Sequence, residues 1–222
     1  MPDEKLPILY SLRNCPFAMR ARIALFRAKQ RVELREVKLT DKPEEMLAAS
    51  AKGTVPILVL PSVQVIDESL DIMRWALTQH DPDNLLLKNL PDSNEDLATQ
   101  MMALIQLFDG EFKACLEQYK CAKRYHEANL TDYRANCEHY LHILEKALNH
   151  HAFVIGEHES LADLAILPFI RQFARVERQW YLQSPYPNLR AWLNRYLQSV
   201  MFTKVMAKHP LWSAQEIKVV IN

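Results

Sequence analysis

The stretch PILYSLRNCPFAMRARIAL, residues 7–25, decides the fold, because it joins a short apolar run to a helical pattern through one cysteine. PILYS (7–11) ends in a polar residue and is typical of a strand. Helical spacing runs from Pro16 to Lys29, with one apolar face formed by Phe17, Ala21, Ala24, Leu25 and Ala28. Pro16 suits the first position of a helix, where its missing N–H costs nothing. The pattern predicts a strand, a turn that holds Cys15, and a helix.

The following residues continue the alternation up to residue 80. Further strands are predicted for VELREVKL (32–39), PILVL (56–60) and VQVID (63–67). Further helices are predicted for KPEEMLAAS (42–50) and SLDIMRWALTQH (69–80). The order β-α-β-α-β-β-α predicts a small mixed α/β domain over residues 1–80.

After residue 80 the alternation of strand and helix patterns ends. DPDNLLLKNLPD (81–92) has two prolines and no period, which indicates a linker. Beyond it we find no convincing strand, and four long segments carry helical spacings of three and four residues: 95–120, 132–150, 160–180 and 187–207. The sequence therefore predicts an all-helical domain over residues 93–222.

Composition narrows the possible partners of this 222-residue chain. A formal net charge of zero without a basic block argues against nucleic acid, and no apolar run is long enough to span a membrane. Three glycines are too few for a glycine-rich phosphate-binding loop. The histidines form no metal-ligand pattern, so no metal is expected. Four irregularly spaced cysteines and the absence of a visible secretory signal indicate the reducing cytoplasm.

Cys15 stands directly before the predicted helix, where free N–H groups and the helix dipole favour a thiolate. Arg13, and Arg20 or Arg22 on the less apolar helix faces, would add positive potential there. The alternative is a small apolar residue at a boundary, since free cysteines are commonly buried. The other three cysteines fall within helical patterns, so position favours a functional role for Cys15.

The ordered set YSLRNCPFAMRARIAL (10–25), KGTVPIL (52–58), DES (67–69) and an all-helical second half resembles the glutathione S-transferase superfamily, in particular its cysteine-type, omega-like branch. The resemblance covers essentially the whole chain. It implies a thioredoxin-like N-terminal domain that binds glutathione, followed by an all-helical transferase-type C-terminal domain. It also implies a homodimer, with glutathione as co-substrate.

The resemblance assigns glutathione-binding residues one position at a time. Val55 and Pro56 match a loop with a cis peptide bond, in which the backbone of Val55 would pair with the cysteinyl part of glutathione. Without the resemblance, Pro56 is an ordinary proline at the start of a strand. Lys42 matches the lysine that reaches the glycyl carboxylate, and Phe17 is also placed among the binding residues.

Glu68 and Ser69 match the pair that holds the γ-glutamyl end of glutathione. The free N–H groups of a helix start are a ready site for its carboxylate, although Ser69 would also serve as an ordinary N-cap. Ser160-x-x-Asp163 matches a helix capping box, which has a structural role only. An apolar stripe at helical spacing is more typical of core than of a pocket, but the resemblance implies that its domain-facing edge lines a second-substrate site: Met101, Met102, Leu104, Phe108 and Phe112.

The position that matches the catalytic one belongs to Cys15, and residue 18 is alanine, so no C-x-x-C pair exists. The prediction is a monothiol enzyme: a glutathione-dependent thiol transferase or dehydroascorbate-type reductase that works through a mixed disulfide. Two alternatives stay open. One is a conjugating transferase in which Ser11 or a backbone group activates glutathione. The other is a non-enzymatic, stringent-starvation-type regulator of the same fold, against which Cys15 and Lys42 argue.

Overall fold

The structure, a computed structural model, describes residues 5–88, 94–214 and 218–222. Residues 1–83 and 199–222 form one compact unit, and residues 84–198 form the other. Of the predicted linker 81–92, residues 89–92 lie outside the described part. None of the described helices is both long and apolar enough to cross a membrane.

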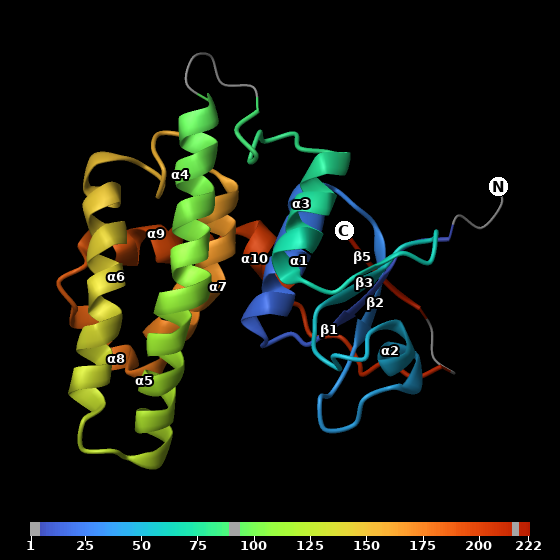
Figure 1. Cartoon of the computed structure of the whole chain (residues 1–222), viewed down its shortest axis with the longest axis horizontal. Helices are drawn as coiled ribbons and strands as arrows, with labels where there is room; N and C mark the ends of the chain where they lie inside the picture. The colour runs from blue at the N-terminus through green and yellow to red at the C-terminus, as the bar shows by residue number, and fades with distance from the viewer. Residues whose placement is uncertain (1–4, 89–93, 215–217) are drawn as a thin grey trace. The chain divides into compact units, whose positions relative to one another are not determined.

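The first unit contains the predicted β-α-β-α-β-β-α order. Its elements are β1 (Ile8–Ser11), α1 (Pro16–Arg27), β2 (Val32–Glu36), α2 (Glu44–Ala49), β3 (Ile57–Val59), β4 (Val65–Ile66) and α3 (Ser69–Gln79). The strand order is β4-β3-β1-β2-β5, with β1 parallel to β2 and the other pairs antiparallel. Helices α1 and α3 cover one face of the sheet and α2 lies on the other (Figure 1). This is the thioredoxin-like arrangement that the resemblance implies.

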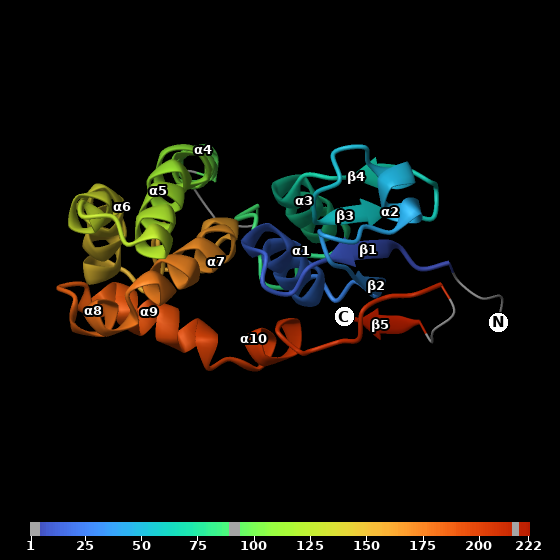
Figure 2. The same ribbon diagram turned by 90° about the horizontal axis from the view of Figure 1, so that it is seen from below.

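The last part of the chain corrects the prediction of an all-helical segment over 93–222. After α10 (Val200–Val205), which packs on α1, the chain forms β5 (Val219–Ile221). This strand pairs antiparallel with β2, so that Val32 faces Ile221 (Figure 2). Its three residues carry no readable alternation. The strand exists because β2 otherwise presents an unpaired edge of N–H and C=O groups.

The second unit is helical, as predicted. It comprises α4 (Asn94–Leu107), the π-helical turn η1 (Phe108–Phe112), α5 (Lys113–Tyr125), α6 (Leu130–His150), α7 (Leu161–Val176), α8 (Arg178–Gln183) and α9 (Pro187–Leu197). The capping box of Ser160 and Asp163 at the start of α7 is confirmed. The buried Asp163 carboxylate also accepts hydrogen bonds from Val154 N–H (3.1 Å) and Trp192 Nε1–H (3.0 Å). It therefore connects the start of α7 to the preceding loop and to α9.

Glu177, between α7 and α8, accepts hydrogen bonds from Tyr119 Oη (2.8 Å) and Arg134 Nη1 (2.7 Å). Burial by itself would raise the pKa of Glu177, but these two hydrogen bonds outweigh it and lower the pKa. Because the folded-state pKa is lowered, the stabilisation is complete above the ordinary glutamate pKa and is lost as pH falls through the lowered value.

We expect Glu177→Gln to lower the free energy of unfolding by about 2 kcal/mol at pH 7, since charged hydrogen bonds are lost. The difference from the wild type should shrink as the pH falls from 7 to about 3. Urea unfolding at several pH values measures it. Glu127→Gln, at an exposed carboxylate, is the control and should leave the pH profile unchanged. If the free energy of unfolding of Glu177→Gln fell below that of the wild type by the same amount at every pH, the electrostatic explanation would be contradicted.

Val63, at the tip of the β3–β4 hairpin, has φ +68°, a left-handed conformation that a β-branched residue rarely adopts. Its side chain is 79% exposed, so little packing is lost when it is removed. We expect Val63→Gly to raise the free energy of unfolding by about 1 kcal/mol, because glycine adopts this conformation without strain. Val200→Gly, at another exposed valine but within a helix, should instead destabilise the protein. A lower free energy of unfolding in Val63→Gly than in the wild type would contradict backbone strain at this residue.

Candidate functional site

Cys15 caps the start of α1, as predicted. Its backbone is extended (φ −76°, ψ 125°), Pro16 opens the helix, and the first turn contains no acidic residue. The Cys15 N–H donates to Leu12 O (2.9 Å), and the Cys15 carbonyl accepts from Met19 N–H (2.9 Å). The half-buried Sγ lies 3.8 Å from the carbonyl oxygen of Val55. The sulfur is thus held at a helix N-terminus and faces the loop that precedes β3.

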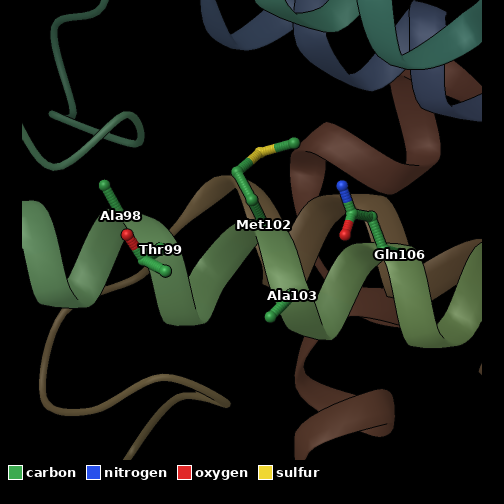
Figure 3. A pocket seen from close by; sticks show the side chains of 5 residues that line it. All are labelled: Ala98, Thr99, Met102, Ala103 and Gln106. Atoms are coloured by element: carbon green, nitrogen blue, oxygen red, sulfur yellow. The ribbon is translucent and has the colours of Figure 1, made fainter.

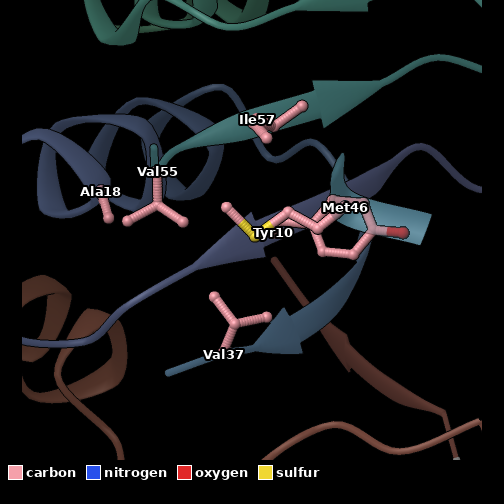
Figure 4. Packing of buried hydrophobic residues seen from close by; sticks show 6 residues of the cluster. All are labelled: Tyr10, Ala18, Val37, Met46, Val55 and Ile57. Atoms are coloured by element: carbon pink, nitrogen blue, oxygen red, sulfur yellow. The ribbon is translucent and has the colours of Figure 1, made fainter. Parts of the chain in front are cut away.

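An apolar cluster from β1, α1, α2 and the loops beside β2 and β3 forms the base under Cys15. Figure 4 shows its members: Tyr10, Ala18, Val37, Met46, Val55 and Ile57. Cys15 packs against this cluster while remaining partly exposed. The sulfur is therefore packed against apolar side chains and still reaches solvent. Cys15 can act as a small apolar residue at this boundary and also as a nucleophile.

The Val55–Pro56 peptide bond is cis, as the resemblance implies. Gly53, two residues earlier, has φ +59°, and a Cβ added there would lie 3.0 Å from Lys42 Nζ. The Lys42 ammonium therefore lies against the backbone of this loop. Among the described residues Lys42 has no ion-pair or hydrogen-bond partner, so its charge is available to a ligand.

Glu68 occupies the N-cap position of α3, and Ser69, which is buried, is the first residue of that helix. Ser69 is therefore not the N-cap. Lys52 Nζ donates to the Glu68 carboxylate (2.7 Å) and to Asp67 Oδ1 (3.0 Å). Ser50 Oγ donates to Asp67 Oδ2 (2.7 Å), and this bond and the one from Lys52 hold the pKa of Asp67 below its ordinary value.

Sequence reasoning missed Lys52, Ser50 and Asp67. Lys52 opens the quoted segment KGTVPIL, and Asp67 opens DES, so each lay beside a recognised residue. The opposite charges of Lys52 and Asp67 were the only sign in the sequence that these two residues could pair. Fifteen residues separate them in the chain, and only the folded loops bring them together.

Neither Tyr10 nor Ser11 is free to act on a ligand at this site. Ser11 is fully buried and its Oγ accepts a hydrogen bond from Arg22 Nε (2.8 Å). The Tyr10 ring lies in the apolar cluster, its Oη accepts from Arg35 Nη1 (2.8 Å), and burial raises the pKa of Tyr10. These contacts argue against the alternative in which Ser11 activates glutathione.

The sequence placed Arg22 on a less apolar face of α1, but the side chain is only 2% exposed. Its guanidinium forms a salt bridge with Glu36 and donates to Ser11 Oγ and, at 3.4 Å, to Val205 O. Burial lowers the pKa of Arg22 and Glu36 partly offsets this. The Coulombic interaction with Cys15 also acts to raise the pKa of Arg22, so the buried guanidinium adds positive potential at Cys15, as expected, although Glu36 balances part of its charge. Glu36 Oε1 also accepts from Arg13 N–H (2.7 Å), which anchors the loop two residues before Cys15.

Phe17 lies on the first turn of α1, and its ring centre is 5.9 Å from the guanidinium carbon of Arg20. Arg20 is 1% exposed, which also differs from the expectation of a polar face on α1. Its long side chain is therefore buried rather than solvated.

The apolar stripe of α4 and η1 divides between core and surface. Met101, Phe108 and Phe112 are buried, as expected of core residues. Met102 lines a shallow pocket on α4 with four neighbours (Figure 3): Ala98, Thr99, Ala103 and Gln106. Met102 and Leu104 are the partly exposed members of the stripe.

Comparison with known proteins agrees with this geometry. Two family models match the chain: the glutathione S-transferase N-terminal domain over residues 9–84 and the C-terminal domain over 108–195. Pyrimidodiazepine synthase of Drosophila melanogaster is 29% identical over 203 residues, covering 88% of this chain and 78% of the relative. Glutathione S-transferase omega-1 of Mus musculus is 25% identical over 194 residues, covering 87% and 77%.

Solved structures share the fold. The glutathione transferase URE2P6 of Phanerochaete chrysosporium, in complex with oxidized glutathione, superposes with a TM-score of 0.77 at 19% identity, covering 92% of this chain and 96% of that one. A family member from Pseudomonas fluorescens with two glutathione bound gives 0.76 at 18% identity, covering 93% and 94%. With both domain models matched in order on this fold, the chain belongs to the glutathione S-transferase superfamily.

Proposed function

We propose that this chain is a glutathione-dependent thiol transferase or reductase of the omega-like branch, with Cys15 as its nucleophile. The observation that carries the proposal is the position of Cys15 Sγ at the N-terminus of α1, 3.8 Å from the carbonyl of Val55. A helix N-terminus stabilises a thiolate, which is the reactive form of cysteine. The 25% identity to an omega-class relative supports the branch.

Glutathione is the co-substrate in this proposal. Its cysteinyl part would lie beside Val55 and Pro56, close to the sulfur. The γ-glutamyl end would reach Glu68 and Ser69 at the start of α3, and the glycyl carboxylate would meet Lys42, which has no ion-pair partner among the described residues. Phe17 would border the ligand from the first turn of α1. Glutathione in the two solved structures above supports this choice.

The reaction follows from a single thiol. The Cys15 thiolate attacks the glutathionyl sulfur of a mixed disulfide, so the Cys15–glutathione disulfide forms and the substrate leaves as a thiolate that takes up a proton. A glutathione thiolate then attacks the glutathionyl sulfur of that disulfide, which releases glutathione disulfide and regenerates the Cys15 thiolate. Residue 18 is a buried alanine, so no C-x-x-C partner resolves the intermediate.

The mass of the protein after incubation with oxidised glutathione tests the proposal. We expect one added glutathionyl group, mapped to Cys15 by peptide analysis. Cys121 is the internal control, because it is more exposed than Cys15 but lies on α5 away from any helix start. An unmodified Cys15, or modification of Cys121 in its place, would overturn the proposed nucleophile.

The non-enzymatic alternative is separated by retention on immobilised glutathione, since a pure interaction module has no need of that ligand. We further propose a homodimer that acts in the reducing cytoplasm. The family resemblance supports the dimer, and the unpaired state of all four cysteines is consistent with that compartment.

A further inference from the structure

The end of the chain returns to the first unit and contacts the residues that hold the turn before Cys15. We call the described residues 205–214 and 218–221 the C-terminal segment. We infer that this segment positions the sulfur of Cys15 through Glu36 and Arg22, with Trp212 as its positioning residue. The inference rests on the proposed function only in taking Cys15 as the reactive thiol.

The C-terminal segment accompanies β2 from one end to the other. Strand β5 pairs antiparallel with residues 32–34, at the start of β2 (Figure 2). Trp212, which precedes β5 in the chain, donates its backbone N–H to the carbonyl of Glu36 (2.8 Å), the last residue of β2. In an antiparallel pair the later residues of one strand meet the earlier residues of the other. Both contacts therefore follow one path, and the backbone of Glu36 is held by the segment.

The Trp212 side chain stabilises this path. Its ring centre lies 4.3 Å from the guanidinium carbon of Arg35, and its ring stands edge-on to Tyr10 with the centres 6.3 Å apart. Arg35 is itself fixed, because it donates to Tyr10 Oη (2.8 Å) and to Glu33 Oε1 (2.8 Å). A cation over an aromatic face and an edge-to-face ring pair are both favourable geometries. Removal of the Trp212 ring should therefore loosen the segment beside Glu36.

Glu36 links the segment to the turn that carries Cys15. Its Oε1 accepts from Arg13 N–H (2.7 Å), and Cys15 N–H donates to Leu12 O (2.9 Å), which closes the turn. The Sγ that follows this turn lies 3.8 Å from the carbonyl oxygen of Val55. The field of a helix terminus acts only within the first turn of the helix. Movement of the turn would therefore change how strongly the helix stabilises a thiolate at Cys15.

Arg22 gives a second connection between the segment and the sulfur. Its Nη1 donates to Val205 O (3.4 Å), and its guanidinium forms the buried salt bridge with Glu36. The charge of Arg22 adds positive potential at Cys15, which favours the thiolate. His209 of the segment faces the same pair, and burial together with the charge of Arg22 lowers the pKa of His209. His209 therefore stays neutral at pH 7 and adds no second charge there.

Alkylation by iodoacetamide measures the reactivity of Cys15 without glutathione. The thiolate is the reactive form, so the rate as a function of pH gives the thiol pKa. Peptide mass analysis separates Cys15 from the exposed Cys121, which is the reference in every sample. We expect Trp212→Leu to slow alkylation of Cys15 at pH 7 at least about fivefold relative to Cys121, and to move the midpoint of its pH profile upward. Trp212→Phe keeps an aromatic ring and should stay within about twofold of the wild type.

Trp180→Leu is the matched control. Trp180 lies in the helical unit, is also half-buried, and has its ring centre 4.4 Å from the guanidinium carbon of Arg134. This substitution removes the same kind of contact and should leave the alkylation of Cys15 unchanged. Equal rates at Cys15 in Trp212→Leu and Trp180→Leu would overturn the inference. A wild-type Cys15 that reacts no faster than Cys121 would contradict the proposed function, while the comparison of the two variants would still decide the inference.

Hydrogen exchange of the wild-type chain gives a test that does not depend on the folding of a variant. Arg13 N–H and Trp212 N–H are both bonded to Glu36, one to its carboxylate and the other to its carbonyl. We expect low urea concentrations to open both amides together, with one opening free energy. Ala28 N–H, which donates to Ala24 O at the end of α1, is the reference and should open only at higher urea. An Arg13 amide that stays protected while Trp212 exchanges would overturn the inference, as would the opening of all three amides together.

Discussion

Replacing Cys15 by serine is expected to reduce glutathione-dependent disulfide reduction by a factor on the order of a thousand or more. A serine hydroxyl at this position fills nearly the same space but is not ionised at neutral pH. It also cannot form a mixed disulfide with glutathione. The loss should appear in kcat, because the residues proposed to bind glutathione are unchanged.

The measurement is steady-state reduction of a small glutathionylated disulfide by the wild type, Cys15→Ser and Cys121→Ser. Cys121→Ser is the matched control and should retain full activity, since this exposed cysteine lies on α5 in the other unit. Circular dichroism should show that both variants fold. Retained reduction in Cys15→Ser would remove the proposed mechanism. Gain of conjugating activity together with retained reduction would identify Cys15 as a bystander.

Replacing Glu36 by glutamine is expected to lower the free energy of unfolding by about 3–5 kcal/mol, because it leaves the buried Arg22 guanidinium without its counter-ion. Glu36 is 8% exposed and Arg22 2% exposed, so water cannot replace the lost partner. Glutamine keeps the volume of the side chain. The effect therefore reports charge rather than packing.

Chemical denaturation at pH 7 measures this loss, and Glu117→Gln at an exposed ion pair is the control, with little measurable change expected. Arg22→Met in the Glu36→Gln background should recover part of the stability, since it removes the unpaired charge. A loss below about 1 kcal/mol in Glu36→Gln would show that the pair is not energetically important. The variant should also reduce activity, because Glu36 anchors the Arg13 backbone near Cys15.

Much of the first unit could be predicted from its periodicities. Residues that pack against one apolar surface must recur at spacings of two or about 3.6, and the order of strands and helices up to residue 80 follows from them. Strand β5 could not be predicted in this way. Its three residues become a strand only because the edge of β2 lies next to them in the fold. In the chain, β2 precedes them by 183 or more residues.

The site divides similarly. Cys15 before a proline at a helix start, and the capping box at Ser160, are local arrangements that the order of residue types reveals. The burial of Arg22 is not local. An arginine on a helix is ordinarily solvated, and here Glu36 and Ser11, from two different strands, provide a buried partner.

By itself the sequence determined where the strands and helices up to residue 80 lie and which cysteine stands at a helix start, because these depend on neighbours within a few residues. The tertiary structure alone decided which charges meet: Lys52 with Glu68, Lys42 with the backbone at Gly53, and Arg22 with Glu36. The physical reason is that electrostatic contacts depend on distance in space, and residues far apart in the chain are brought within a few ångströms only by the packed fold.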